Sequence, residues 1–179
     1  DWYRSRGLGD VYKRQGKVIV LGIVFPADLL QSASVAYIHY LSFMLCFGAL
    51  LFERISLKVD PNRQEAISMV IADIIYGIAG IALLVSGIYR VIKFGQGSEF
   101  YTENPIFWIK IIFFALVGSL SLYPTITYVL WAIPLSKGTL PKVTENMVSR
   151  LRLIINIELV GFASIPFLAT LMARGVGLA

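Results

Sequence analysis

Apolar residues occur in long blocks along this chain, and most charged residues lie between the blocks. A helix needs about 20 consecutive, mostly apolar residues to cross the hydrocarbon core of a bilayer. A backbone in lipid must satisfy its hydrogen bonds within helices or a closed barrel, and the two-residue alternation of a membrane barrel strand is absent here. The pattern therefore predicts an all-α, integral membrane four-helix bundle, with spans at about 34–52, 67–89, 105–131 and 153–173.

Two of the predicted spans begin with helix-start signals. Residues 62–65 read Asn-Arg-Gln-Glu, which resembles a capping box, a pair of reciprocal bonds between side chains and backbone N–H groups ahead of a helix. Asn104-Pro105 places a proline at the first helical position of the third span, a favourable place for it. Both signals predict where a helix begins, and neither indicates a chemical activity.

The composition supports the membrane interpretation and excludes several classes of enzyme. Hydrophobic residues make up 57% of the chain and charged residues 15%, whereas soluble domains have about 45–50% and about 25%. The single histidine excludes a bis-histidine cytochrome within this chain, and the single cysteine, Cys46, excludes an internal disulfide. The sequence also has no zinc-ligand spacing, no phosphate-binding glycine loop and no serine–histidine nucleophile motif. Most enzyme classes are excluded on these grounds.

The first fifteen residues do not resemble native sequence. Residues 5–15 read Ser-Arg-Gly-Leu-Gly-Asp-Val-Tyr-Lys-Arg-Gln, which is the translation of a transposon-based sequencing adapter. We interpret residues 1–15 as a sequencing-adapter artefact in a metagenomic reading frame that ran through adapter into gene. Residues 16–33 have three open interpretations, a signal-like segment, an interfacial helix or translated upstream sequence, because Pro26 and Asp28 interrupt their apolar stretch. The transmembrane domain is expected at 34–177.

The distribution of Lys and Arg predicts an orientation in a bacterial inner membrane. Without the fifteen residues the net charge falls from +5 to +3, because four basic and two acidic residues are removed. This mild excess is typical of orientation charge in loops, so no nucleic-acid partner is expected. The loops that follow the first and third spans carry Arg54, Lys58, Arg63, Lys137, Lys142, Arg150 and Arg152. The opposite side carries Lys17, Arg90, Lys93 and Arg174. We therefore expect those two loops in the cytoplasm and both termini outside it.

Basic residues near the outer face form the first candidate site. His39 and Lys110 lie inside the spans, where an ionisable group costs about 2.5–3.5 kcal/mol at the bilayer centre and needs a partner. In an antiparallel bundle both would lie in one layer with Arg90. This layer suits an anionic, partly apolar ligand such as a porphyrin propionate or a lipid head group. A histidine that is only hydrogen-bonded is the equally weighted alternative.

Acidic residues near the opposite face form a second layer. Asp73 and Glu158 lie inside the spans at a similar depth to Glu53, with Arg54, Arg150 and Arg152 nearby. We expect a structural polar layer held by ion pairs in preference to a proton relay. Helical spacing places Tyr76 on the stripe of Asp73, together with Gly77, Gly80 and Gly87. Glycines on such a stripe predict close approach of a neighbouring helix.

Several segments resemble an uncharacterised family of bacterial predicted membrane proteins of unknown function, over nearly the whole chain from about residue 35 to 177. The segments that carry this resemblance are Tyr37-Ile-His-Tyr-Leu-Ser-Phe, Asp73-Ile-Ile-Tyr-Gly, Gly87-Ile-Tyr-Arg90, Phe107-Trp-Ile-Lys110, Leu122-Tyr-Pro-Thr125 and Leu171-Met-Ala-Arg-Gly. More distantly, the arrangement is similar to the HemJ-type membrane protoporphyrinogen oxidase. That similarity implies a haem cofactor and functional roles for His39 and Lys110. The Asn156-Ile-Glu158 run loosely resembles the Asn-Glu motif of that family.

Three functional hypotheses follow. The first is a redox protein that binds haem b or a porphyrin through His39, Lys110 and Arg90, with His39 as a single haem-iron ligand and His39 and Lys110 as catalytic candidates. The second is a non-enzymatic membrane protein, a small transporter or assembly subunit, in which the buried charges serve helix packing. A proton-coupled carrier using Asp73 and Glu158 ranks last, because the chain has no inverted repeat. A homo-oligomer is compatible with all three.

Overall fold

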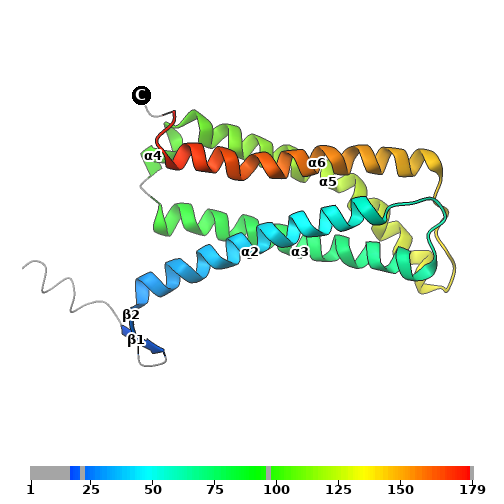
Figure 1. Ribbon diagram of the computed structural model, residues 1–179, viewed down its shortest axis with the longest axis horizontal. Coiled ribbons are helices and arrows are strands. Elements are labelled where there is room, and N and C mark those ends of the chain that lie inside the picture. Colours follow the sequence, from blue (N-terminus) through cyan, green and yellow to red (C-terminus); the bar gives the residue numbers. More distant parts are fainter. Residues whose placement is uncertain (1–16, 21–22, 96–97, 178–179) are drawn as a thin grey trace, which may run out of the picture.

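A computed structural model describes residues 17–20, 23–95 and 98–177 of the chain. Its long helices are α2 (Ala27–Ser56), α3 (Arg63–Phe94), α5 (Pro105–Ser136) and α6 (Glu145–Ala173). They run antiparallel to one another in chain order (Figure 1). Each is long and apolar enough to cross a membrane. The predicted all-α membrane bundle is therefore confirmed, and the helices extend beyond the predicted spans because polar turns continue each helix past its apolar stretch.

Shorter elements lie at the end of the bundle opposite the α2–α3 connection. Strands β1 (Lys17–Val20) and β2 (Ile23–Pro26) pair antiparallel, and α4 (Ser98–Thr102) precedes α5. A hairpin followed directly by α2 was not among the interpretations of residues 16–33. Pro26 is the N-cap residue of α2, so Asp28 lies in the first helical turn instead of interrupting a segment. Residues 1–15, interpreted as an adapter artefact, lie outside the described residues.

The four long helices close into a ring. Helix α2 packs on α3 and α5 packs on α6, and contacts of α3 with α5 and of α2 with α6 join the two pairs. In Figure 1 α6 runs along the top of the bundle, and α5 runs obliquely from the upper left, beside α6, to the lower right, beside α3. This arrangement allows one inward-facing stripe from each helix to meet the others, which is the geometry that the polar stripes of the sequence require.

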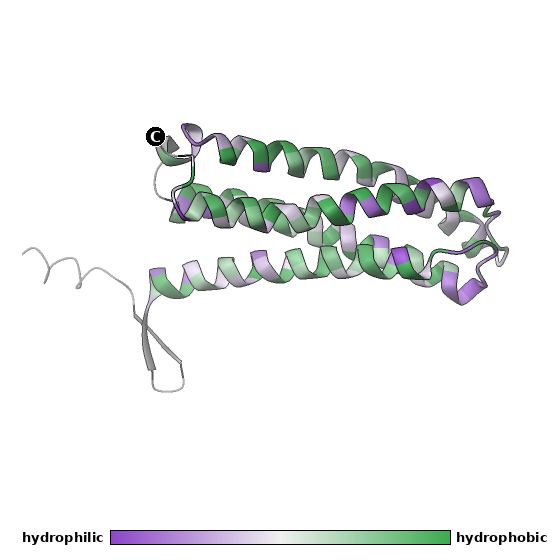
Figure 2. Cartoon of the chain, turned by 45° about the horizontal axis from the view of Figure 1, so that its top comes forward, coloured by the Kyte–Doolittle hydropathy of each residue, from purple (hydrophilic) through white to green (hydrophobic). Residues whose placement is uncertain are grey.

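The bundle has two halves that differ in packing. In the loop half, next to the α2–α3 and α5–α6 connections, buried side chains form one core around Leu50, Met69, Tyr128, Leu151 and Ile155. In the terminal half the helices bury few side chains, and α5 buries none between Pro105 and Leu116. Apolar residues cover most of the helix surfaces, whereas polar residues gather at the connections (Figure 2). The outer surface is therefore suited to lipid, and the terminal half is packed less tightly than the loop half.

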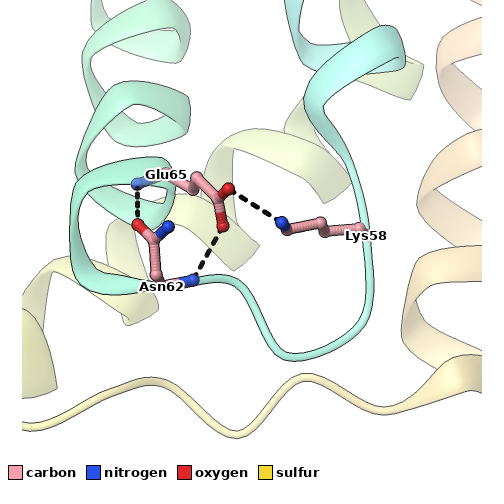
Figure 3. Close-up of polar contacts among 3 residues, drawn as sticks. All are labelled: Lys58, Asn62 and Glu65. Carbon is pink, nitrogen blue, oxygen red and sulfur yellow. Dashed lines mark hydrogen bonds and ion pairs between the residues drawn. The ribbon is translucent and has the colours of Figure 1, made fainter.

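Local capping bonds fix the first turn of α3. Asn62 accepts a hydrogen bond from the Glu65 backbone N–H at 2.9 Å, and the Glu65 carboxylate accepts one from the Asn62 N–H at 2.8 Å. Lys58 forms an ion pair with Glu65 at 2.7 Å (Figure 3). The bonds from Lys58 and from the Asn62 backbone hold the pKa of Glu65 below its ordinary value. The capping box predicted at 62–65 is thus confirmed.

A second capping residue, Asn104, begins α5 and also holds the end of the chain. Its side-chain oxygen accepts from the Ile106 N–H at 2.9 Å, and its amide donates to the Val176 carbonyl at 3.2 Å. Asn104 is fully buried, and Pro105 follows it at the first helical position, as predicted. The residues after α6 are thereby tied to the start of α5, which closes the terminal end of that helix pair.

Only one of the predicted glycines allows a close approach of a neighbouring helix, and a glycine outside that stripe allows another. A Cβ at Gly77 or Gly80 would meet no atom within 4 Å, because these residues face away from the neighbouring helices. At Gly161 of α6, in contrast, a Cβ would lie 2.5 Å from Cγ2 of Val117 in α5. At Gly87 it would lie 3.2 Å from Cε1 of His39. Only Gly87 of the predicted stripe therefore permits a close contact, and it is a contact with the candidate site.

Candidate functional site

The structure places His39 of α2 against α3. Its imidazole Nδ1 lies 3.0 Å from the Ser86 hydroxyl oxygen, and the ring is partly buried. Gly87 leaves the space that the imidazole occupies. Sequence reasoning missed Ser86, although its position four residues before Arg90 on the same helix could have indicated it.

The bonds of Ser86 favour one of the two neutral tautomers of His39. The Ser86 hydroxyl donates its only proton to a backbone carbonyl, at 2.6 Å from the Ala82 oxygen. With the Ser86 proton directed to that carbonyl, the Ser86 oxygen accepts from the Nδ1–H of His39, which is the tautomer in which Nε2 keeps a lone pair. A metal-binding histidine typically has this arrangement, in which a bond from the second nitrogen orients the ring.

Two cations lie in electrostatic range of His39. Arg90 and Lys110 both act on the imidazole, and each acts on the other. Arg90 donates to the Tyr40 hydroxyl at 3.4 Å and lies 5.1 Å from the centre of that ring. The Lys110 ammonium lies 5.2 Å from the centre of the Phe107 ring. Within the described residues neither cation has a carboxylate partner. The layer predicted from the sequence therefore carries a net positive charge, and its two cations lie over aromatic rings.

The acidic layer lies in the loop half and is deeply buried. Glu158 is 0% exposed, Glu53 1% and Asp73 6%. Asp73 accepts a bond from the Thr125 hydroxyl at 2.8 Å. Tyr76 shares a 2.5 Å hydrogen bond with Ser121. Each of the four long helices contributes to this layer.

The expected ion pairs of the acidic layer do not form. Arg54 donates instead to the Asn156 side chain at 2.6 Å, and Arg152 donates to the Leu57 carbonyl at 3.3 Å. Arg150 is exposed. In the described part of the chain the single ion pair is the one between Lys58 and Glu65. The reason is geometric, since the arginines lie on helix turns nearer the connections, where backbone and amide oxygens are closer than the carboxylates.

The two layers have different chemical capacities. Over the described ranges no three His, Cys, Asp or Glu side chains are placed to hold a metal ion together. His39 could contribute one nitrogen to a metal that a ligand itself carries, and Arg90 and Lys110 could bind anionic groups. The acidic layer could bind protons. The candidate residues thus fall into two separate clusters, one in each half of the bundle.

Comparison with known proteins gives one result. A family model described as "Predicted membrane protein (DUF2214)" matches residues 31–177. No curated protein and no solved structure matches the chain. The family match includes all four long helices and both polar layers, apart from the first turn of α2. The chain therefore belongs to this family of predicted membrane proteins of unknown function.

Proposed function

We propose that this membrane protein binds haem or a related porphyrin and has a redox role, with His39 as the single iron ligand. The observation that carries the proposal is the bond between His39 Nδ1 and the Ser86 oxygen at 3.0 Å. Because that bond leaves the Nε2 lone pair available, His39 has the protonation state that an iron ligand needs. The side chains of the terminal half are mostly apolar and few of them are buried, which supports the binding of an apolar ring there.

Arg90 and Lys110 supply the second part of the proposed site. A porphyrin combines an apolar ring with carboxylate side groups, and charge-assisted bonds from Arg or Lys are the strong way to bind carboxylates. Both cations are partly buried and lack a carboxylate partner among the residues described. A bound haem supplies one-electron chemistry, so an enzymatic role would be that of an oxidoreductase, with His39 and Lys110 as its catalytic candidates.

The test is the visible absorption spectrum of the protein purified in mild detergent, expressed from Gly16 with an added start codon in haem-replete cells. We expect a Soret band in the parent that His39→Ala abolishes. Gly80→Ala is the matched control, since an added Cβ there meets no atom within 4 Å. A band that persists in His39→Ala would oppose iron ligation by this residue. A colourless parent would refute the proposal.

The polar contacts of the loop half favour a second candidate, a non-enzymatic transporter or assembly subunit. Arg54 binds Asn156 across α2 and α6, and Asp73 binds Thr125 across α3 and α5. Bonds of this kind between helices specify packing in a membrane. Under this hypothesis Asp73→Asn alters assembly in detergent, measured by size-exclusion chromatography, whereas His39→Ala changes neither assembly nor colour.

We further propose a placement in the bacterial inner membrane with both termini outside the cytoplasm. The support is the excess of Lys and Arg in the two loops that follow α2 and α5. Thr139→Cys in the α5–α6 connection should react with a membrane-impermeant maleimide only after permeabilisation, and Glu103→Cys before it. The native Cys46 is fully buried and provides the unlabelled background. The reverse labelling pattern would overturn the orientation.

A further inference from the structure

The loop half contains carboxyl oxygens that have no hydrogen-bond donor. Glu158 is 0% exposed and Glu53 is 1% exposed. Within the described residues, both carboxyl oxygens of Glu158 and Oε1 of Glu53 lack any partner. These groups come from α6 and α2, which contact each other in the ring of helices. A buried carboxylate without donors is strongly unfavourable, because no solvent or partner compensates for its charge.

The Tyr128 hydroxyl is a second, independent unpartnered polar group at this place. Tyr128 is 0% exposed, and its hydroxyl also has no partner in the described part of the chain. It lies in electrostatic range of Glu53, Asp73 and Glu158 together. Helix α5 therefore directs an unpartnered polar group toward the carboxyls that α2 and α6 direct inward.

The neighbouring donors are already used by other acceptors. Thr125 donates to Asp73, and Ser121 donates to the Val117 carbonyl at 2.8 Å. Tyr76 must then donate to the Ser121 oxygen, because the Ser121 proton is engaged. Arg54 and Arg152 donate to amide and carbonyl oxygens instead of to the carboxyls. Ser121 is the hydroxyl that acts on Glu158, but its bond goes to the Val117 carbonyl. Within the described residues, Glu53 Oε1 and both Glu158 oxygens therefore receive no hydrogen bond, and no cation pairs with them.

From this arrangement we infer that Glu53 and Glu158 form a proton-binding site inside the bundle, distinct from the proposed porphyrin site. A bound proton removes the carboxylate charge and gives the carboxyl an O–H group, which can donate a hydrogen bond to an unpartnered oxygen. A metal ion is a poorer match, since no three ligating side chains converge over the described ranges. The charged and titratable groups that face this site are Cys46, Glu53, Arg54, Asp73, Tyr76, Tyr128, Arg152 and Glu158.

The connection side offers the shorter route for proton uptake. Glu53 lies three residues before the end of α2 at Ser56. A pocket of about 250 Å³ lies at the α5–α6 connection and is lined in part by Thr127, Trp131 and Lys142. Trp131 packs edge-on against Tyr128, with ring centres 5.2 Å apart. Protons from that side would reach Glu53 first and the deeper Glu158 afterwards.

Infrared spectroscopy of the whole protein in lipid tests the inference. A protonated carboxyl has a C=O stretching band that shifts in D₂O, and we expect this band in the parent at neutral pH. Glu158→Gln and Glu53→Gln should each remove one component of it, and the double variant should remove the band. Gln keeps the size of a protonated Glu, so the helicity measured by circular dichroism should be unchanged. Glu145→Gln, an exposed change on the same helix, should leave the band intact.

Two results would overturn the proton site. One is the absence of a D₂O-sensitive carboxyl band in the parent between neutral and mildly acidic pH. The other is an increase in thermal stability with Na⁺, but not with choline, that Glu158→Gln abolishes, which would assign the carboxyls to a cation. Both readouts are independent of porphyrin. A colourless parent that has the carboxyl band would therefore refute the proposed porphyrin function and leave the proton site standing.

Discussion

The contact between Gly161 and Val117 makes the sharpest prediction about stability. Gly161 of α6 is buried, and a Cβ there would lie 2.5 Å from Cγ2 of Val117. An unstrained contact between carbon atoms is about 3.5–4.0 Å, so Gly161→Ala must displace the valine or the helix by about 1 Å. Valine in a helix has one strongly preferred χ1 rotamer, so a simple rotation does not relieve the clash.

The magnitude follows from two opposed contributions. Ala is favoured over Gly in a helix by about 0.8–1.0 kcal/mol, whereas an extra methyl group in a packed core typically costs about 1–3 kcal/mol. Gly118→Ala on α5 is the matched control, because an added Cβ there meets no atom within 4 Å. Gly118→Ala therefore gains the helix propensity of alanine without the cost of an overpacked core. Gly161→Ala should therefore be less stable than Gly118→Ala by about 1–3 kcal/mol.

The assay is unfolding by sodium dodecyl sulfate from mild detergent, followed by circular dichroism, with a double-mutant cycle. Val117→Ala removes Cγ2 and should restore part of the stability that Gly161→Ala removes, with an interaction energy of about 1–3 kcal/mol. Equal stability of Gly161→Ala and Gly118→Ala, or strict additivity in the cycle, would refute the close contact of α5 with α6.

Three further predictions concern other named contacts. Gly87→Ala should displace the His39 imidazole by a few tenths of an ångström, because the added Cβ would lie 3.2 Å from its Cε1, and should therefore shift or weaken the expected Soret band. Gly80→Ala should leave the band unchanged, and identical spectra for the two variants would contradict this packing. Asn104→Ala removes the N-cap bond of α5 and should lower stability by about 0.5–2 kcal/mol in thermal unfolding, whereas an unchanged melting temperature would mean that the cap contributes nothing. The stabilisation from the Glu65 carboxylate should be present above its ordinary pKa of 4.5 and lost as the pH falls through its lower folded-state pKa. Glu65→Gln should therefore be less stable than the parent at neutral pH and should match it in acid, and a constant difference across that range would exclude the carboxylate as the cause.

Local signals predicted several features correctly because their causes lie within a few residues. The capping box at 62–65 depends on two side chains three positions apart. The N-cap at Asn104 depends on the amide N–H two residues later. The depth of each charged residue also follows from counting along a helix of known rise. The basic and acidic layers could be separated in the sequence for this reason.

Contacts between helices could not be predicted in the same way. The partner of His39 is Ser86, 47 residues later, and their meeting depends on how α2 and α3 rotate and cross. The expected ion pairs failed for a similar reason: the arginines met amide and backbone oxygens of other helices and loops nearer the connections before they met the carboxylates. The choice of Gly161 and Gly87 over Gly77 as close contacts is likewise a matter of helix rotation.

The sequence by itself determined that this chain crosses a membrane as four helices and that its charges gather in two layers. A backbone in lipid has no water to bind, so it must form helices to satisfy its hydrogen bonds. The length and hydropathy of a segment are enough to identify such a helix. Only the tertiary structure decided which residues meet, such as His39 with Ser86, and which oxygens of Glu53 and Glu158 have no partner. Partnership depends on distances of a few tenths of an ångström between side chains of different helices, which residue spacing along one helix does not contain.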